Sequence, residues 1–435
     1  MQGTRRQLMT GALAALALGP SLPGLASEAP DPARVLHDWY RLILELVRHT
    51  PTFSPPVASR AFALIGVTAY QALSAPGSHS LAGQLTDLAP PPARPAGLND
   101  AAVLHAALSA ATAGYFANTG PTGQRAMAVM TDRQGARVNA SLSPAVANAS
   151  ADHGRAVAAH IAAWAAADGG AVITNLGFPE TWRMAESAAE WVPTTLVRLQ
   201  QTPLLPNWGT NRPFALPSVD ACPLPPPPTY SEDPASPFYA EATEVYQTVR
   251  NLTKEQRMTA RYWSDDPMLS PTPPGHWISI AMQCLEAQQA PAHRRAEVLA
   301  LVGITVADAF IVCWRAKYQY DLLRPVTYIR RVIDKTWEPI LITPPFPEYP
   351  SGHSTQSAAA AAVLTHVFGA GFAFGDATGV DEGLPARDFA DFRTAAVEAG
   401  MSRLYGGIHF RSGMEQGLAQ GAAVADHTLR LITRG

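Results

Sequence analysis

Two cations in the C-terminal half of the chain stand at a spacing that suits anion binding. Lys317 and Arg324 are seven residues apart, or two helical turns, so both lie on one face of a predicted helix, about 10 Å apart along its axis. Pro325 cannot continue that helix, and we expect Arg324 at its end. Two cations on one face can clamp an oxyanion. A solvated, charged helix end is the simpler interpretation of this pair taken alone.

A histidine follows at the start of a second predicted helix, in the segment PPFPEYPSGHST (344–355). The backbone N–H groups at a helix start have no helical acceptor, so they can bind an anion. Ser351 adds a hydroxyl, and Gly352 lets the backbone approach a ligand closely. His353 stands at the edge of this anion site and can give or take a proton, because imidazole titrates near neutral pH. A helix cap beside a packed histidine is an equally simple interpretation.

A third cation and a second histidine occur together in the segment SRLYGGIH (402–409). Gly406 and Gly407 lie between Arg403 and His409 and permit a sharp turn. Such a turn can aim both side chains at one place.

Taken in order, Lys-x6-Arg-Pro, PSGH and Ser-Arg-x5-His resemble the signature shared by vanadium-dependent haloperoxidases and the type-2 phosphatidic acid phosphatase superfamily. Twenty-four residues separate Pro325 from Pro350, and 48 separate His353 from Ser402; both gaps suit that signature. The resemblance covers about residues 262–430. It implies an all-α fold of two packed helical bundles, of the vanadium chloroperoxidase type.

The resemblance also implies a role for each of these side chains. Cationic and hydrogen-bonding groups would surround a bound vanadate or phosphate: Lys317, Arg324, Arg403, Ser351 and Gly352. His353 would be the catalytic acid–base, and Lys317 would also polarise the bound peroxide. His409 would be the axial ligand of vanadium or, in a phosphatase, the nucleophile toward phosphorus.

The surrounding residues favour the haloperoxidase branch. PPFPEYPSGH resembles the haloperoxidase lead-in, and Phe346 falls where such enzymes place a side chain beside the vanadate, with a Phe resembling the chloroperoxidase type. The segment 262–277 also resembles a haloperoxidase segment, and within it Asp266 is expected to pair with Arg403. A turn or a helix cap is the alternative for Asp265 and Asp266.

We therefore expect a vanadium-dependent haloperoxidase with vanadate as its cofactor and with neither haem nor flavin. Its expected partners are hydrogen peroxide, a halide and a small organic acceptor. The alternative is an exported acid phosphatase that acts on phosphate monoesters through a phosphohistidine at His409. A non-catalytic helical module is a second alternative, which the complete set of cations and histidines disfavours.

One position departs from the family pattern. The family often has Asp four residues after the axial histidine, where it hydrogen-bonds the ring and raises its basicity. That position is Gly413 here. Ser412 or Glu415 is the expected substitute, and without one His409 would be a weaker ligand and nucleophile. His276, in the segment PPGHW, is expected to pack at a helix start, with the site as the alternative.

Helical periodicity dominates the rest of the chain. Apolar residues recur at helical spacing over 35–49 and 56–73, an alanine-rich helix is expected over 141–168, and Asn99 predicts the cap of another helix. The expected organisation has four parts: an export signal (1–28), an N-terminal helical bundle (29–202), a Pro-rich connector (203–237) and a C-terminal bundle with the oxyanion site (238–435).

The first residues resemble an export signal. Arg5 and Arg6 precede a short apolar run, 8–18, and small residues follow near 25–27. The Arg-Arg pair predicts twin-arginine export, with an ordinary secretory signal as the alternative. We expect an exported protein that works in the periplasm or outside the cell.

Composition excludes several classes of protein. Only 15% of the 435 residues are charged and the net charge is −3, which argues against nucleic-acid binding. Cys222, Cys284 and Cys313 form no CxxC pair, so we expect buried thiols rather than a zinc site or a disulfide framework. No segment after the export signal predicts a stable membrane span, and a homodimer is compatible with a helical bundle.

Overall fold

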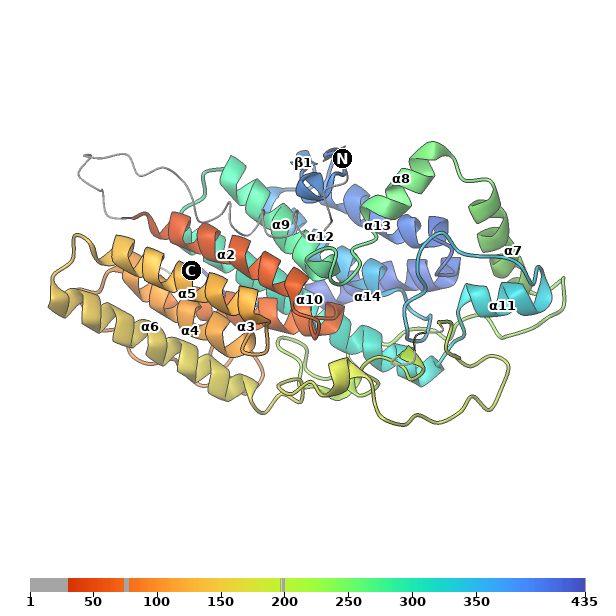
Figure 1. Cartoon of the computed structure of the whole chain (residues 1–435), viewed down its shortest axis with the longest axis horizontal. Coiled ribbons are helices and arrows are strands. Elements are labelled where there is room, and N and C mark those ends of the chain that lie inside the picture. Colours follow the sequence, from red (N-terminus) through yellow and green to blue (C-terminus); the bar gives the residue numbers. More distant parts are fainter. Residues whose placement is uncertain (1–29, 74–77, 196, 198–199, 435) are drawn as a thin grey trace, which may run out of the picture.

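The computed structural model describes most of the chain: residues 30–73, 78–195, 197 and 200–434. The predicted export signal lies outside the described residues. Within the described part, thirteen α-helices accompany one small antiparallel sheet, made of β1 (Phe374–Asp376) and β2 (Arg387–Phe389) (Figure 1). The predicted all-α fold is confirmed.

The first group of helices comprises α2 (Pro32–His49), α3 (Pro55–Ala72), α4 (Asp100–Tyr115), α5 (Pro121–Asn139) and α6 (Pro144–Ala165). Their starts follow the sequence signals. The side chains of Asp31, Asn99 and Ser143 each accept a backbone N–H in the first turn, so the predicted Asn99 cap is confirmed. Proline stands in the first turn of four of these helices, where its missing N–H costs nothing.

The second group comprises α7 (Pro237–Arg250), α8 (Lys254–Tyr262), α9 (Thr272–Ala287), α10 (Ala292–Tyr320), α11 (Pro325–Val332), α12 (Gly352–Phe368), α13 (Phe392–Tyr405) and α14 (Arg411–Thr428). Short 3₁₀ turns occur at Asn175–Gly177 (η1), Trp208–Thr210 (η3) and Val380–Glu382 (η4). All three cysteines are buried and free, as predicted.

Helix α10 runs through the middle of the molecule and packs on both α3 and α12 (Figure 1). Its backbone contacts that of α3 directly, because a Cβ added at Gly303 would lie 2.8 Å from the carbonyl oxygen of Phe62. α10 is long and apolar enough to cross a membrane, but its apolar stretch is wholly buried inside the molecule. An apolar helix of this kind is what a protein core requires.

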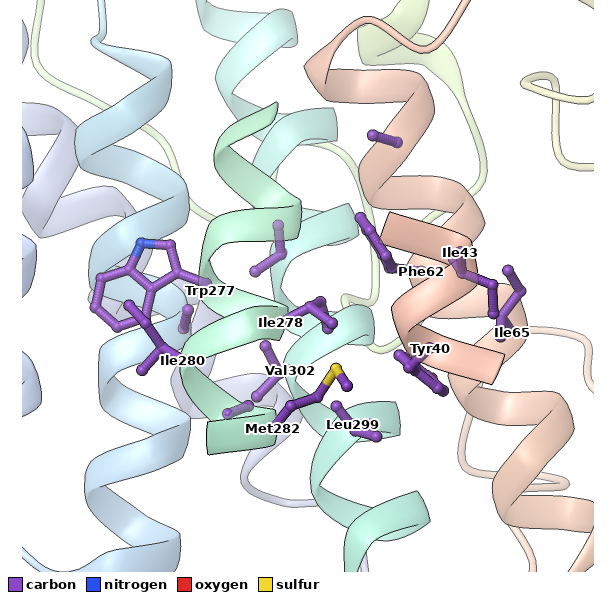
Figure 2. Close-up of a cluster of buried hydrophobic side chains, with 14 of the residues drawn as sticks. Tyr40, Ile43, Phe62, Ile65, Trp277, Ile278, Ile280, Met282, Leu299 and Val302 are labelled. Atoms are coloured by element: carbon purple, nitrogen blue, oxygen red, sulfur yellow. The ribbon is translucent and has the colours of Figure 1, made fainter. Parts of the chain in front are cut away.

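The hydrophobic core joins the two groups of helices. Figure 2 shows Tyr40 of α2, Phe62 of α3 and Leu299 of α10 gathered with Ile278 of α9. Trp277 points away from them, toward α12, and its indole N–H donates to Ser357 Oγ (2.9 Å). One buried cluster thus extends across the predicted connector, and the division into two bundles at 203–237 stays a prediction.

Three glycines of α14 let it approach the start of α12. Gly413, Gly417 and Gly421 recur every four residues and therefore share one face of the helix. A Cβ at Gly421 would lie 1.9 Å from the carbonyl oxygen of Thr355, and one at Gly417 would lie 2.8 Å from that of Ser351. The glycines thus bring the backbone of α14 against the PSGH segment.

The Pro-rich connector is fastened to α10 by one buried carboxylate. Asp308 accepts the backbone N–H groups of Phe214 (2.6 Å), Ala215 (2.8 Å) and Leu216 (3.0 Å). A segment with few regular hydrogen bonds needs such acceptors, because buried N–H groups are costly when unpaired.

We predict that Asp308→Ala destabilises the protein by about 3 kcal/mol or more, because it removes the acceptor of three buried N–H groups. Urea and thermal unfolding would measure the loss. The control is Asp152→Ala, which removes an exposed carboxylate paired with Arg155 and should cost less than about 1 kcal/mol. Equal effects of the two substitutions would contradict the anchoring role.

Candidate functional site

The predicted site residues meet where the end of α10, the loop 344–351 and the start of α12 contact the end of α13 and the start of α14. Lys317, Arg324, Arg403 and His409 are all buried there. Burial first, and then the charges of these three cations, hold the pKa of His409 well below its usual range. The three cations therefore lie close enough to act on the same histidine, and their binding of an oxyanion stays a prediction.

The structure corrects the placement of Arg324. Helix α10 ends at Tyr320, Asp321 has a left-handed backbone (φ 44°), and Arg324 is the N-cap of α11. Arg324 is therefore not the last residue of the helix that carries Lys317. Proline cannot continue a helix, but it is well suited to the first turn of one. Pro325 begins α11 in this way.

Lys317 holds the loop that precedes α12. Its Nζ donates to the carbonyl oxygens of Pro347 (2.9 Å), Glu348 (2.9 Å) and Pro350 (2.5 Å). An ammonium has three N–H donors, so all of them are used by the backbone here. Burial lowers the pKa of Lys317 to about 7. Its predicted contact with an oxyanion or peroxide stays a prediction.

Arg324 links the same loop to His409. Its Nε donates to the carbonyl oxygen of Phe346 (2.8 Å), and its Nη1 donates to that of Ile408 (2.8 Å) and lies 3.1 Å from His409 Nε2. Burial lowers the pKa of Arg324 to about 10, so it remains charged at neutral pH. The Phe346 ring lies 5.0 Å from the guanidinium and 5.1 Å from Lys317 Nζ. Phe346 is thus a wall of the cation cluster.

The PSGH segment begins α12 as the sequence predicted. Ser351 is the N-cap, and its Oγ accepts the N–H of Ser354 (3.3 Å). Gly352 and His353 form the first turn, where N–H groups have no helical acceptor. Burial first, and then Arg403, hold the pKa of His353 well below its usual range, so the ring is neutral. The His353 Nε2 atom is buried without a hydrogen-bond partner among the described residues.

Sequence reasoning missed the carboxylate that orients His409. Glu348 Oε1 lies 2.6 Å from His409 Nδ1 and also accepts the N–H of Phe410 (3.0 Å). Burial raises the pKa of Glu348 to about 7, but its Oε1 already accepts from Phe410 and therefore acts as an acceptor. Nδ1 of His409 then carries the proton and Nε2 keeps its lone pair. Neither expected substitute does this, because Ser412 donates to Glu241 (2.7 Å) and Glu415 pairs with Arg411.

Gly413 leaves the space that the Glu348 carboxylate occupies. A Cβ at Gly413 would lie 2.3 Å from Glu348 Oε1, so the carboxylate occupies the space that any side chain there would need. The carbonyl oxygen of Gly413 also accepts the N–H of Ser351 (2.8 Å). The one usable signal in the sequence was a lone Glu in a Pro- and aromatic-rich loop five residues before His353.

Arg403 is held by backbone carbonyls rather than by Asp266. Its Nη2 donates to the carbonyl oxygens of Trp263 (2.5 Å) and Ala260 (3.2 Å), and its Nε donates to Ser402 Oγ (2.9 Å). Among the described residues, the expected ion pair between Asp266 and Arg403 does not form. Burial lowers the pKa of Arg403 to about 10, and the charges of Asp265 and Asp266 oppose this lowering. The carbonyl oxygen of Trp263, three residues before Asp266, therefore accepts from Arg403 where the Asp266 carboxylate was expected.

The arrangement suits a tetrahedral oxyanion. Arg324 and Arg403 remain charged, since carbonyl oxygens satisfy their donors without cancelling their charge. Arg324 Nη2 is buried and has no partner among the described residues, and a buried donor is costly unless a ligand accepts it. His409 Nε2 adds a lone pair at the same place. These groups fit vanadate or phosphate.

The chain resembles known proteins in sequence and in structure. A family model described as the VCPO second helical-bundle domain matches residues 297–434. The crystal structure of a bacterial vanadium-dependent iodoperoxidase matches with 34% identity and a TM-score of 0.85, covering 95% of this chain and 99% of that one. A holo-type bacterial vanadium-dependent chloroperoxidase matches with 16% identity and a TM-score of 0.68, covering 88% of this chain and 94% of that one. The search of curated proteins found no significant match.

We predict that Glu348→Gln weakens binding of orthovanadate or phosphate by about 10-fold or more, because a neutral amide is a poorer acceptor for His409 Nδ1–H. Gly413→Ala should weaken it similarly by displacing the carboxylate. Calorimetric titration would measure the dissociation constant. The control is Gly114→Ala, also in a helix but facing open space, which should leave the constant unchanged. Wild-type affinity in both site variants would remove Glu348 from the site.

Proposed function

Because the chain belongs to the vanadium-dependent haloperoxidase family, we propose that it uses hydrogen peroxide to oxidise a halide to hypohalous acid at a vanadate held by His409. The observation that carries the proposal is the His409 ring: Glu348 orients it through Nδ1, and its unprotonated Nε2 accepts from Arg324 Nη1 (3.1 Å), a contact that bound vanadate would replace. This is the state that a metal-ligating histidine requires. We propose iodide as the first halide to test, since the similar iodoperoxidase covers nearly the whole chain.

The protein's own residues would do the following work. Arg324 and Arg403 would offset the charge of the bound oxyanion, and the N–H groups at the start of α12 would donate to it. Bound vanadate supplies a Lewis acid that activates peroxide without a change in its own oxidation state. His353, neutral because it is buried beside Arg403, would accept the proton that peroxide releases on binding.

A phosphatase is the second candidate, and one observation favours it. A neutral, buried His409 with its lone pair toward the cations is also suited to attack on phosphorus. Vanadate and phosphate are both tetrahedral oxyanions, so the same cluster accommodates either. Activity on a phosphate monoester without halide oxidation would favour this candidate.

Export remains part of the proposal. It rests on the sequence pattern around Arg5 and Arg6. Fractionation of expressing cells, with Arg5→Lys/Arg6→Lys as the comparison, would test whether the twin arginines direct it.

We predict that orthovanadate switches on iodide oxidation by the purified, vanadate-depleted protein, measured as triiodide absorbance with peroxide and iodide. Bromination of a phenol dye would report bromide oxidation in the same sample. No halide oxidation after loading with vanadate, or equal rates before and after loading, would contradict the proposal.

We also predict that His353→Ala lowers kcat for halide oxidation about 100-fold or more, because it removes the proton acceptor. Vanadate affinity should change far less, since His353 is not expected to ligate vanadium. His366→Ala is the matched control, an exposed histidine of the same helix. A wild-type rate in His353→Ala would remove this residue from the mechanism.

A further inference from the structure

A second buried histidine lies behind the site, clamped between two carboxylates. His276 Nδ1 lies 3.0 Å from Asp265 Oδ1, and His276 Nε2 lies 2.7 Å from Asp376 Oδ2. All three side chains are buried. They come from the α8–α9 loop, from α9 and from β1, which the sequence gives no reason to associate.

A carboxylate faces each ring nitrogen of His276, which favours a proton on both. A neutral imidazole has one N–H, so its other nitrogen would turn a lone pair toward a carboxylate. Asp376 accepts here as a carboxylate: burial raises its pKa, but His276 and the N–H (2.9 Å) and hydroxyl (2.6 Å) of Thr378 together hold that pKa well below its usual range. Burial lowers the pKa of His276, but Asp265 and Asp376 together raise it well above its usual range. His276 is therefore an imidazolium.

The His276 imidazolium contacts the segment 263–265, which in turn lies against Arg403 and His353. Trp263 stacks on the His276 ring, with centroids 4.5 Å apart, and its carbonyl oxygen accepts from Arg403 Nη2 (2.5 Å). Asp265 Oδ2 lies 4.0 Å from His353 Nε2. Both ends of the short segment 263–265 therefore act on residues that the proposed function uses.

The backbone of this segment is strained and needs such support. Asp265 has a left-handed backbone with φ 48°, and Met268 and Thr272 follow with φ 68° and 65°. A non-glycine residue in this region of backbone conformation is uncommon and persists only where its surroundings hold it. The bond from Asp265 to His276 supplies that hold, because it ties the strained residue to α9.

We propose that His276 is a positioning residue of the active site: clamped by Asp265 and Asp376 and stacked on Trp263, it fixes the carbonyl that holds Arg403 and the carboxylate that faces His353. The inference rests on the proposed function for the role of His353. The positioning of Arg403 does not depend on peroxidase activity, because Arg403 would serve any oxyanion site. His276 touches neither the oxyanion nor the peroxide and acts through its neighbours.

The first test replaces the imidazolium by an amide in the full-length protein. His276→Gln can reach only one of the two carboxylates and carries no charge. We expect the dissociation constant for orthovanadate to rise about 10-fold or more, and kcat at saturating vanadate to fall about 10-fold or more. His366→Gln, on the exposed face of α12, should leave both quantities within about twofold of wild type.

A second variant keeps the proposal testable if His276→Gln fails to fold. Asp376→Asn keeps an acceptor for His276 Nε2–H and is hydrogen-bonded to neither Arg403 nor His353. It should change the same two quantities in the same direction but by less. Nitrogen-15 NMR should show both ring nitrogens of His276 protonated at pH 7 in the wild type. A neutral His276, or folded variants with wild-type affinity and kcat, would overturn the proposal.

The outcome separates this inference from the proposed function. Binding of inorganic phosphate is measured beside halide oxidation for every variant. If the vanadate-loaded wild type oxidises no halide but His276→Gln still weakens phosphate binding, the peroxidase proposal fails and the positioning role stands. If the wild type oxidises halide and His276→Gln and Asp376→Asn match it in both measurements, the positioning role fails and the peroxidase proposal stands.

Discussion

The burial of cations against backbone carbonyls is the constraint on which the site depends. Lys317, Arg324 and Arg403 lie in the interior, and carbonyl oxygens accept from each of them. Carbonyl dipoles satisfy the donors but leave the positive charge of Arg324 and Arg403 in place, whereas a carboxylate partner would cancel it. The cluster therefore keeps a charge that a bound anion can offset, and the fold must supply carbonyls at fixed positions.

Much of the architecture serves to fix those carbonyls. The loop 344–351 turns several of them toward Lys317 and Arg324, and the end of α8 presents those of Ala260 and Trp263 to Arg403. The loop has few backbone hydrogen bonds to other segments, such as that from the Glu348 N–H to Leu322 (2.9 Å), and the end of α8 is the last turn of a short helix. The loop is held by α14, whose glycine face lets Gly413 accept the N–H of Ser351, and the α8 end is held by the stack on α9. A backbone displaced at either place would leave a buried charge unsatisfied.

The sequence predicted the parts of the site that depend on residue type and order. Helical periodicity and caps gave the all-α fold and the Asn99 start, and the spaced Lys, Arg and His residues gave the cluster around His409. It did not predict contacts between distant segments. Glu348 and His409 are 61 residues apart, and His276 and Asp376 are 100 apart, so only the tertiary fold pairs them. The break between α10 and α11 was missed because proline ends and begins helices equally well.

In this chain the carboxylate that contacts His409 Nδ1 comes from Glu348 in the loop, and position 413 of α14 is a glycine. The limited space around this ring nitrogen explains why both features occur together. His409 Nδ1 needs an acceptor, and that acceptor can come from α14 itself or from the loop facing it. It cannot come from both, because a Cβ at 413 would lie 2.3 Å from the Glu348 carboxylate. Gly413, four residues after His409, is therefore no sign of a weakened site in this chain, because Glu348 supplies the acceptor. Positions 348 and 413 therefore depend on each other: a side chain at 413 requires that the Glu348 carboxylate be moved or removed.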